Sequence, residues 1–308
     1  MDKLSRLLKN RDFIFLSAFV LGLVASGGAD YTKAVIIPAL AVVMTLSAMG
    51  IPSSIFRSPK MVIGSMFFGV IMTYGVLGTS IILLSHLLIS NQSLFVGFII
   101  AASVPPAIAI VPFTGFLDGE ESFSLLSVVG GFLSALIIMP LVILIFLGAA
   151  IIDIHKILIV IIELIAIPLL LSRVLIRVGA DKKIEPIKGV LTNWSFFLVF
   201  YTMVGVNKEI IMSEPLSLLP AASIRFATTF ALGVAIFLVS KISKVPQKKT
   251  TSLILLGTMK NYGLSAGLTL TLLGNTEALP SAVLTVFLIV YFIWLSFLKR
   301  RGWGNFKT

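Results

Sequence analysis

Residues 250–272, TTSLILLGTMKNYGLSAGLTLTL, are apolar enough to cross a lipid bilayer, yet they hold Lys260 near their centre. About 20 helical residues cross the hydrocarbon core of a bilayer. A charged side chain at that depth is costly and normally faces the interior of a helix bundle. The alternative is that Lys260 reaches the membrane surface, but about ten residues separate it from either end of the run. The stretch therefore predicts a membrane span with a polar interruption.

The composition extends this interpretation to the whole chain. Hydrophobic residues make up 58% and charged residues 12% of the 308 residues, whereas a soluble domain has roughly 25% charged residues. Most of the surface must face lipid, where only helices satisfy their own backbone groups across such segments. The sequence predicts an all-α, polytopic membrane protein with one transmembrane domain over residues 1–308. The ten predicted spans are 13–28, 34–51, 61–87, 94–111, 122–150, 155–176, 189–206, 217–240, 250–272 and 278–298.

The basic residues orient these spans. Most lie in loops on the side of the N-terminus, for example Lys182 and Lys248, whereas the opposite side has only Lys33, Lys156 and Lys208. Because short cytoplasmic loops accumulate Lys and Arg, we expect a multi-pass protein of the cell membrane with both termini in the cytoplasm. The basic segment before span 1 resembles the start of a signal peptide, but the charge balance favours a retained first helix.

The residue inventory argues against several classes of function. Cysteine is absent, and His86 and His155 are the only histidines, so we expect no metal centre and no cofactor. The net charge of +11 would fit nucleic acid binding, but its one-sided distribution makes the lipid bilayer the expected partner and argues against nucleic acid. An intramembrane enzyme would need nucleophilic, acidic or metal-binding groups at one depth, and we expect none.

A second interruption lies in span 4, where residues 104–112 read VPPAIAIVP. Proline removes a helical hydrogen bond and clashes with the preceding turn, so Pro105, Pro106 and Pro112 predict local unwinding. Freed backbone groups at membrane depth must face protein or a water-filled cavity. A simple kink, or a span that ends early, is the alternative. In span 9, Gly257 and Gly263 flank the corresponding break.

The two breaks occupy the fourth position of each half of the chain. Five spans in each half would give two inverted repeats, an arrangement common in secondary transporters, and paired breaks then indicate the transport site. Span 2 ends with Gly50 followed by Pro59, and span 7 ends with Gly205 followed by Pro215. Isoleucine and serine residues recur at matching offsets between them. The sequence therefore predicts two inverted five-helix repeats.

Two further charged residues lie within predicted spans, Glu163 in span 6 and Arg225 in span 8. An intramembrane charge is expected to have a partner. Glu163 is a candidate counter-ion for Lys260, but it fits Arg225 equally well. Glu163 could also be protonated and hydrogen-bonded within the bundle, and Arg225 could extend to the membrane surface.

With these features in place, the chain resembles the bile acid:sodium symporter family in the number and spacing of its spans. The family pattern Pro-Gly-Gly-Thr-Ala-Ser-Asn of span 4 corresponds to residues 105–111, where Pro105 and Ala109 match. The pattern Glu-x-Gly-x-Gln-Asn of span 9 corresponds to residues 256–261, where Asn261 matches. Span 2 looks like the Met-Gly span of the family, and span 5 keeps Ser124 and Pro140.

The resemblance implies that spans 4 and 9 cross at their unwound centres. Spans 3–5 and 8–10 would form a core, spans 1, 2, 6 and 7 would form a panel, and substrate would bind in the crevice between them. Backbone amides at the starts of half-helices attract anions. We therefore expect Ile108, Ala109, Thr258 and Asn261 to contact substrate.

The departures from the family concern the sodium ligands. The family's glutamate and glutamine in span 9 are replaced by Leu256 and Lys260, and its serine and asparagine in span 4 by Ile110 and Val111. Ser124 is a residual match. Hard cations need oxygen ligands, so we expect transport that is not sodium-coupled in the family manner. The hypothesis is that the Lys260 ammonium takes the place of sodium, with a proton or no ion as the coupling ion.

We therefore expect a secondary transporter that moves a small organic anion by alternating access. A related efflux carrier, like those for arsenite or auxin, is the first alternative, although the missing cysteine disfavours a thiol-based arsenite site. An intramembrane enzyme or a channel is a more distant alternative. Saturable transport would distinguish a carrier from a channel.

Overall fold

The computed structural model of the chain describes residues 10–50, 59–148, 154–213 and 215–300. Every regular element in these ranges is a helix. In the first half they are α2 (Arg11–Val24), η1 (Ser26–Gly28), α3 (Ala29–Thr32), η2 (Lys33–Val35), α4 (Ile36–Ala48), α5 (Pro59–Val70), η4 (Ile71–Gly78), α6 (Thr79–Leu88), α7 (Gln92–Ser103), α8 (Ile110–Phe116) and α9 (Glu121–Leu147). In the second half they are α10 (Ile154–Ile161), η5 (Ile162–Ala166), α11 (Ile167–Arg177), α12 (Ala180–Val206), α13 (Lys208–Ser213), η6 (Pro215–Leu218), α14 (Leu219–Phe226), η7 (Ala227–Ala231), α15 (Leu232–Ile242), α16 (Gln247–Leu256), α17 (Tyr262–Leu272) and α18 (Asn275–Arg300).

Asparagine side chains cap the starts of α2, α7 and α17. The side-chain oxygens of Asn10, Asn91 and Asn261 each accept a hydrogen bond from the backbone N–H three residues later, at 3.0–3.1 Å. Such a cap satisfies one of the N–H groups that a helix leaves unpaired at its start. The short polar residue thus marks where an apolar run becomes a helix.

Six described helical segments are long and apolar enough to cross a membrane: Ser26–Ala48, Ile63–Leu88, Glu121–Leu147, Leu158–Arg177, Ala180–Val206 and Leu219–Ile242. Large apolar side chains such as Leu87, Ile145 and Leu170 are exposed on them. Because lipid accepts such side chains and water does not, the chain is an all-helical, multi-pass membrane protein. Helices lie within each of the ten segments predicted from the sequence, while ten crossings and an inverted repeat stay predictions.

One predicted boundary is wrong. The sequence predicts span 7 from residue 189, but α12 begins at Ala180. Its first turns contain Lys182, Lys183 and Glu185, which are exposed and therefore carry no apolar signal. Charged residues of this kind are good helix formers, so the helix continues beyond the apolar run.

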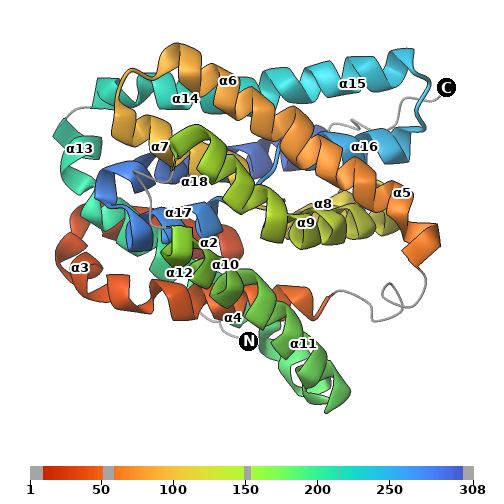
Figure 1. Ribbon diagram of the computed structural model, residues 1–308, viewed down its shortest axis with the longest axis horizontal. Coiled ribbons are helices and arrows are strands. Elements are labelled where there is room, and N and C mark those ends of the chain that lie inside the picture. Colours follow the sequence, from red (N-terminus) through yellow and green to blue (C-terminus); the bar gives the residue numbers. More distant parts are fainter. Residues whose placement is uncertain (1–9, 51–58, 149–153, 214, 301–308) are drawn as a thin grey trace.

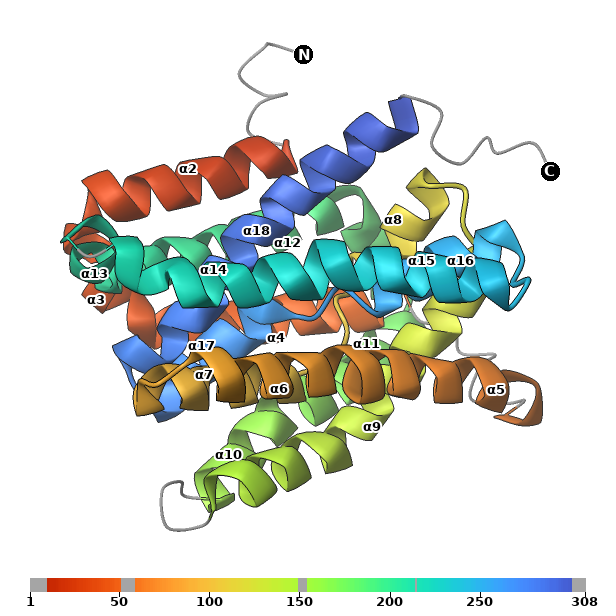
Figure 2. The same ribbon diagram turned by 90° about the horizontal axis from the view of Figure 1, so that it is seen from above.

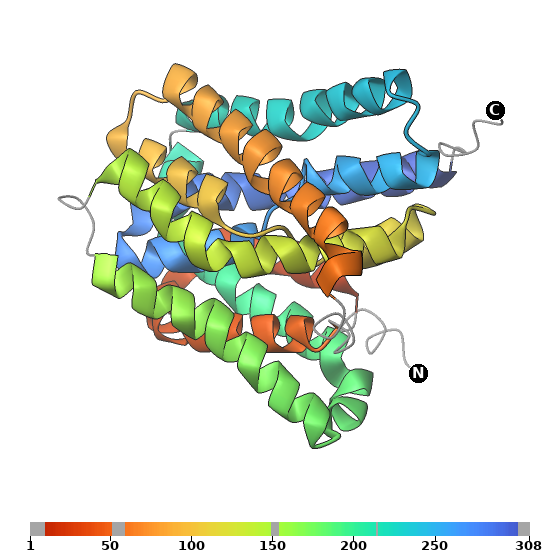
Figure 3. The ribbon, with the colours of Figure 1, turned by 45° about the vertical axis from the view of Figure 1, so that its right-hand side comes forward.

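The helices form two groups. Helices α2, α4, α11 and α12 pack on one another, and we call them the panel helices. The core helices, α5 to α9 and α14 to α18 with η4 and η7, make their main contacts among themselves. In Figures 1 and 3 the panel helices lie in the lower half of the molecule and most core helices above them. The space between the two groups is where a cavity can form.

Two long rods in the core contain a π-helical segment each, α5–η4–α6 and α14–η7–α15. Figure 2 shows that these rods run in opposite directions. π-Helical segments are rare and often mark functional sites. Here η4 carries Tyr74, and η7 directly follows the turn that carries Arg225; both residues contact the interruption of span 9.

The helix ends sort into two sides. The ends of α4, α8, α11 and α15 lie toward the right-hand end of Figure 1, and the ends of α6, α9, α12 and α17 toward the left. The first side carries basic residues such as Lys182, Lys244 and Lys248. We call it the basic end; by the distribution of lysine and arginine we expect it to face the cytoplasm.

Candidate functional site

The two interrupted spans cross and pair with each other through their backbones. Helix α7 ends at Ser103 and α8 begins at Ile110, while α16 ends at Leu256 and α17 begins at Tyr262. Between them, the Ala107 N–H donates to the Met259 carbonyl (3.3 Å), and the Asn261 N–H donates to the Pro105 carbonyl (3.0 Å). Pro106 and Lys260 lie opposite each other in an antiparallel bridge. The predicted crossing of the two breaks is therefore present.

Lys260 replaces a donor that proline removes. In a continuous helix the Ala102 carbonyl would accept from the N–H of residue 106, but Pro106 has none. The Lys260 Nζ donates to the Ala102 carbonyl at 2.6 Å and to the Val104 carbonyl at 2.8 Å, with a fully buried side chain. It also lies 4.4 Å from the centre of the Tyr74 ring, a favourable cation–π contact. The lysine therefore closes the break in span 4 and does not reach the membrane surface.

Glu163, a candidate counter-ion for Lys260 or for Arg225, forms no salt bridge with either residue. Glu163 lies on η5 with an exposed side chain, whereas Lys260 is buried at the crossing. No salt bridge of Lys260 occurs among the described residues. Leu164 and Ile165 of the same segment are buried instead, and the sequence pattern does not reveal which face of η5 meets the bundle.

Arg225 performs the corresponding task for the break in span 9, and it does not extend to the membrane surface. Its side chain is fully buried. Nη1 donates to the Thr258 carbonyl at 3.2 Å and to the Tyr262 hydroxyl at 2.9 Å, and the guanidinium lies 4.7 Å from the centre of the Tyr262 ring. The Thr258 carbonyl needs this donor because the Tyr262 N–H bonds to the Lys260 carbonyl instead.

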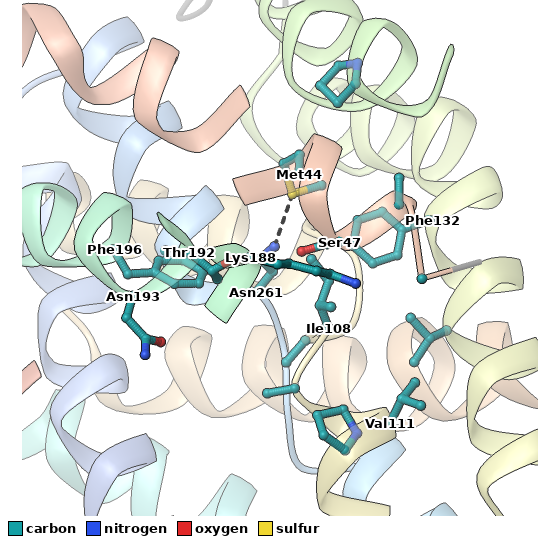
Figure 4. A pocket seen from close by; sticks show the side chains of 18 of the residues that line it. Met44, Ser47, Ile108, Val111, Phe132, Lys188, Thr192, Asn193, Phe196 and Asn261 are labelled. Carbon is teal, nitrogen blue, oxygen red and sulfur yellow. Dashed lines mark hydrogen bonds between the residues drawn. The ribbon is translucent and has the colours of Figure 1, made fainter. Parts of the chain in front are cut away.

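A cavity of ≈ 570 Å³ lies between the panel and core helices, at the crossing. Its apolar wall includes Phe15, Phe132, Phe196 and Leu125. Its polar groups include Ser47, Lys188, Thr192, Asn193 and Asn261, and Glu185, Lys260, Tyr262 and Thr285 also line it. Figure 4 shows these side chains projecting into the cavity from several elements, with Asn261 bonded to Met44. A mainly apolar pocket with a few converging polar groups is typical of a site for a small organic molecule.

The exposed residues of the cavity lining, Gly50, Pro112, Glu185 and Gly189, all lie toward the basic end, so the cavity opens there and is closed at the other end. Gly50, at the end of α4, and the Lys188–Glu185 pair, with 3.5 Å between Nζ and Oε2, line the open end. At the other end α17 packs on α4 and α12. A Cβ at Gly263 would lie 2.7 Å from the Phe196 ring, and one at Gly267 2.1 Å from Leu40. Glycine permits this tight contact, which separates the cavity from the far side.

Several residues predicted to form the site line this cavity. Ile108 and Ala109, from the break in span 4, are half-buried at its wall, and Pro112 and Gly263 also line it. Asn261 lines it too: it caps α17 with its oxygen and donates to the Met44 sulfur with its nitrogen. These residues come from both breaks, as the crossing requires.

Thr258 does not line the cavity, contrary to the prediction. Its hydroxyl donates to the Ile254 carbonyl and pairs with the Tyr291 hydroxyl at 3.2 Å. The side chain therefore faces the core helices, on the side of the crossing away from the cavity. Thr258 lies in a turn after α16, and Met259 and Lys260 separate it from Asn261. The chain is not helical over these residues, so a helical spacing argument does not give the direction of their side chains.

Three more predicted residues have structural contacts. Ser124 accepts a hydrogen bond from Thr114 at 2.8 Å and so ties α8 to α9. Gly257 caps α16 beside Ile236. Pro106 packs on Gly131, where a Cβ would lie 2.5 Å from the proline ring.

The panel side of the site was missed. Lys188, Thr192, Phe196 and Phe200 line the cavity and follow one another at intervals of four along α12. Residues at this spacing share one face of a helix. The polar members of this stripe, within an otherwise apolar segment, were a usable signal. What the sequence does not show is that this face meets the crossing.

Models of known protein families give no match to this chain, and curated protein sequences give none either.

Proposed function

We propose that the protein is a secondary transporter that moves a small organic anion across the membrane by alternating access. The observation that carries the proposal is a cavity that reaches the crossing of two broken spans and opens toward one side. Paired breaks at membrane depth are typical of substrate sites in such transporters. A carrier needs a site that is closed on one side while it is open on the other, and this cavity has that form.

The charge of the lining favours an anion. Lys188 stands at the open end, and the start of α17, with Tyr262 and Gly263, forms part of the wall. The N-terminus of a helix carries a partial positive charge and unpaired N–H groups. The Asn193 and Asn261 side chains add polar groups. Glu185 is the only acidic residue in the described lining, and its carboxylate already pairs with Lys188.

The apolar wall favours an organic substrate. Phe15, Phe132 and Phe196 offer contact area to hydrocarbon or ring systems, whereas a small inorganic ion would leave them unpaired. Burial of apolar surface contributes about 25 cal/mol per Å². An amphipathic carboxylate would bind with its charge near Asn261 or Lys188 and its apolar part against the phenylalanines.

Alternating access would move the panel helices against the core helices. The present state is open toward the basic end, which we expect to be cytoplasmic. Reorientation would separate α17 from α4 and α12 and bring α8 and α9 against the panel. The opposite directions of α5–η4–α6 and α14–η7–α15 in Figure 2 support an inverted repeat, which provides two such states of similar geometry.

We also propose that the protein is a divergent relative of the bile acid:sodium symporter family that does not couple to sodium in the family manner. Lys260 supports the absence of sodium coupling, because its ammonium group already donates hydrogen bonds to the carbonyl oxygens of Ala102 and Val104. Because the Lys260 ammonium takes the place of a sodium ion at the crossing, substrate transport would be coupled to a proton or to no ion. The cell membrane, with cytoplasmic termini, is the proposed location.

The test uses purified protein. A thermal-shift screen of aliphatic, aromatic and sterol-like carboxylates, with and without sodium, selects a ligand, and its uptake is then measured in proteoliposomes. We expect saturable uptake without sodium, reduced by Phe196→Ala or Asn193→Ala. Exposed Leu87→Ala, on α6 outside the cavity, is the control and leaves uptake unchanged. Uptake that requires a sodium gradient contradicts the coupling proposal, and failure of every carboxylate to bind contradicts the anion proposal.

A further inference from the structure

Two lysines line the cavity, and only one of them is available to a ligand. The Lys260 side chain is fully buried, and its ammonium group donates to the carbonyls of Ala102 and Val104. The Lys188 side chain is 25% exposed, and Figure 4 shows it projecting into the cavity. Within the described lining, Lys188 is therefore the cation that the charge of a bound anion can meet.

The polar groups at the crossing are already bonded within the protein. The Asn261 side chain accepts from the Leu264 N–H and donates to the Met44 sulfur. The Tyr262 N–H, the first of α17, donates to the Lys260 carbonyl. An anionic group bound at the crossing would have to displace such bonds, and replacing them is costly in a buried site. The charge of the ligand is therefore better placed at the open end of the cavity than at the crossing.

The lining contributed by α12 changes from charged to aromatic with depth. From the open end inward it presents Lys188, Thr192, Phe196 and Phe200, over a length of about 18 Å at 1.5 Å per residue. The Phe196 and Phe200 rings stack with 5.6 Å between their centres, and the Phe15 ring meets both edge-on. A ligand that matches this order has its charge at the open end and its apolar body inside.

Glu185 holds the place that the charged group of such a ligand would take. It lines the open end of the cavity, and its Oε2 lies 3.5 Å from the Lys188 Nζ. This distance is long for a hydrogen bond to a charged group, and the Glu185 side chain is 68% exposed. Exposed ion pairs of this kind contribute little to stability. A carboxylate from a ligand can therefore replace Glu185 at small cost.

We propose that Lys188 is the specificity-determining residue of the transport site, and that it selects amphipathic monoanions whose head group displaces Glu185. The apolar body of the ligand then lies against Phe196 and the rings beyond it. Because the described lining holds no further exposed cation, a second negative charge on the ligand would face Glu185 without a partner. Glu185 is a built-in competitor that lowers affinity at the open end and so favours release there. The inference rests on the proposed function and assigns the charge of the substrate to one end of the site.

The experiment titrates the purified full-length protein in nanodiscs with phenylbutyrate, its neutral analogue phenylbutanol and the dianion phenylsuccinate. We expect the wild-type protein to bind phenylbutyrate most tightly. Lys188→Gln should raise the Kd of phenylbutyrate about tenfold, the effect of losing one hydrogen bond to a charged group, and leave that of phenylbutanol unchanged. Glu185→Gln should lower the Kd of phenylbutyrate about threefold, as expected from the removal of an exposed ion pair.

Lys182→Gln is the matched control. Lys182 is exposed in the first turns of the same helix and is not part of the described lining, so all three dissociation constants should stay as in the wild-type protein. Equal weakening by Lys182→Gln and Lys188→Gln would mean that the whole basic end attracts the anion, which overturns the inference.

Three further results bear on the inference and on the proposed function in different ways. Binding of phenylbutyrate that Lys188→Gln does not weaken, or that Glu185→Gln does not tighten, overturns the inference and leaves the proposed transporter intact. Phenylsuccinate binding as tight as that of phenylbutyrate overturns the selection for a single charge. Failure of phenylbutyrate to bind the wild-type protein while phenylbutanol binds contradicts both the inference and the anion proposal.

Discussion

The breaks in spans 4 and 9 reach the same crossing in different ways. In span 4, two prolines remove backbone donors, and the side chain of Lys260 supplies the replacement. In span 9 there is no proline: the chain leaves the helix at Gly257, and Arg225 from a distant rod satisfies the freed Thr258 carbonyl. In both breaks a cation from another span satisfies the freed carbonyl groups. Only the break in span 4 contains prolines that interrupt the helix locally, so the break in span 9 depends more on tertiary contacts.

The largest loss of stability is expected from Lys260→Met, which keeps an unbranched side chain one atom shorter and removes the ammonium group. The Ala102 and Val104 carbonyls would lose their donor in a buried site. We expect a loss of roughly 2–5 kcal/mol in the free energy of unfolding, from two unsatisfied buried groups. Thermal or denaturant unfolding of the purified protein measures this loss. Lys248→Met, at an exposed lysine on α16, should change stability little.

A second variant at position 260 tests whether the lysine stabilises the crossing through its N–H donors or through its volume. Lys260→Ala would leave both carbonyls and the Tyr74 ring facing a space that a small cation fits. We expect ammonium or methylammonium to restore part of the lost Tm, whereas tetramethylammonium, which has no N–H donor, should not. Equal restoration by all three ions would mean that volume and not hydrogen bonding is what Lys260 supplies.

The next largest loss of stability is expected from substituting the glycine beside each break, Gly131 for span 4 and Gly257 for span 9. A Cβ on Gly131 would lie 2.5 and 2.6 Å from the ring atoms of Pro106, and a Cβ on Gly257 would lie 2.4 Å from the Ile236 Cδ1 and 2.8 Å from the Met72 Cε. The proline ring is rigid, while the two side-chain ends can move. We therefore expect Gly131→Ala to cost about 1–3 kcal/mol, as overpacking does, and Gly257→Ala less. Unfolding of the two variants under identical conditions checks the order, and the reverse order would refute it.

A smaller effect on stability distinguishes the capping role of Asn261 from its role in the cavity wall. Asn261→Ala removes the cap of α17 and should cost about 1 kcal/mol, and it should also weaken ligand binding. Asn193→Ala, on α12, removes a lining group that has no cap role, so only ligand binding should weaken. Thermal unfolding and ligand titration of both variants test this. Equal losses of stability would show that Asn261 is no more structural than Asn193.

The sequence predicted the features that arise from local chemistry. Residues 104–112 and Lys260 indicated two breaks at membrane depth, and the helical segments followed from their apolar runs. Glu163 and Thr258 were misplaced because composition does not mark which face of η5 meets the bundle, or where the chain turns after α16. Arg225 was recognised as an unusual charge, but its target, the Thr258 carbonyl, lies on another span. Such contacts between distant segments depend on packing, which one sequence does not display.

The row of cavity residues along α12 shows the same limit of prediction from sequence. The spacing of Lys188, Thr192 and Phe196 is visible in the sequence, and it predicts a shared helical face. Which element this face meets is decided by how α12 packs against α17 and α4. The cavity could therefore be expected from the resemblance to a transporter family, but its residues on the panel could not be chosen.

The central claim is that the crossing opens into a water-filled cavity from the basic end only, and single-cysteine labelling tests it most directly. The chain has no cysteine, so Ile108→Cys, at the cavity wall, and Thr258→Cys, buried toward the core, give clean signals. We expect a membrane-impermeant maleimide to label the residue 108 variant from the cytoplasmic side in inside-out vesicles, and to leave the residue 258 variant unlabelled. Labelling of residue 108 from neither side, or only by a lipid-soluble reagent, would contradict the account.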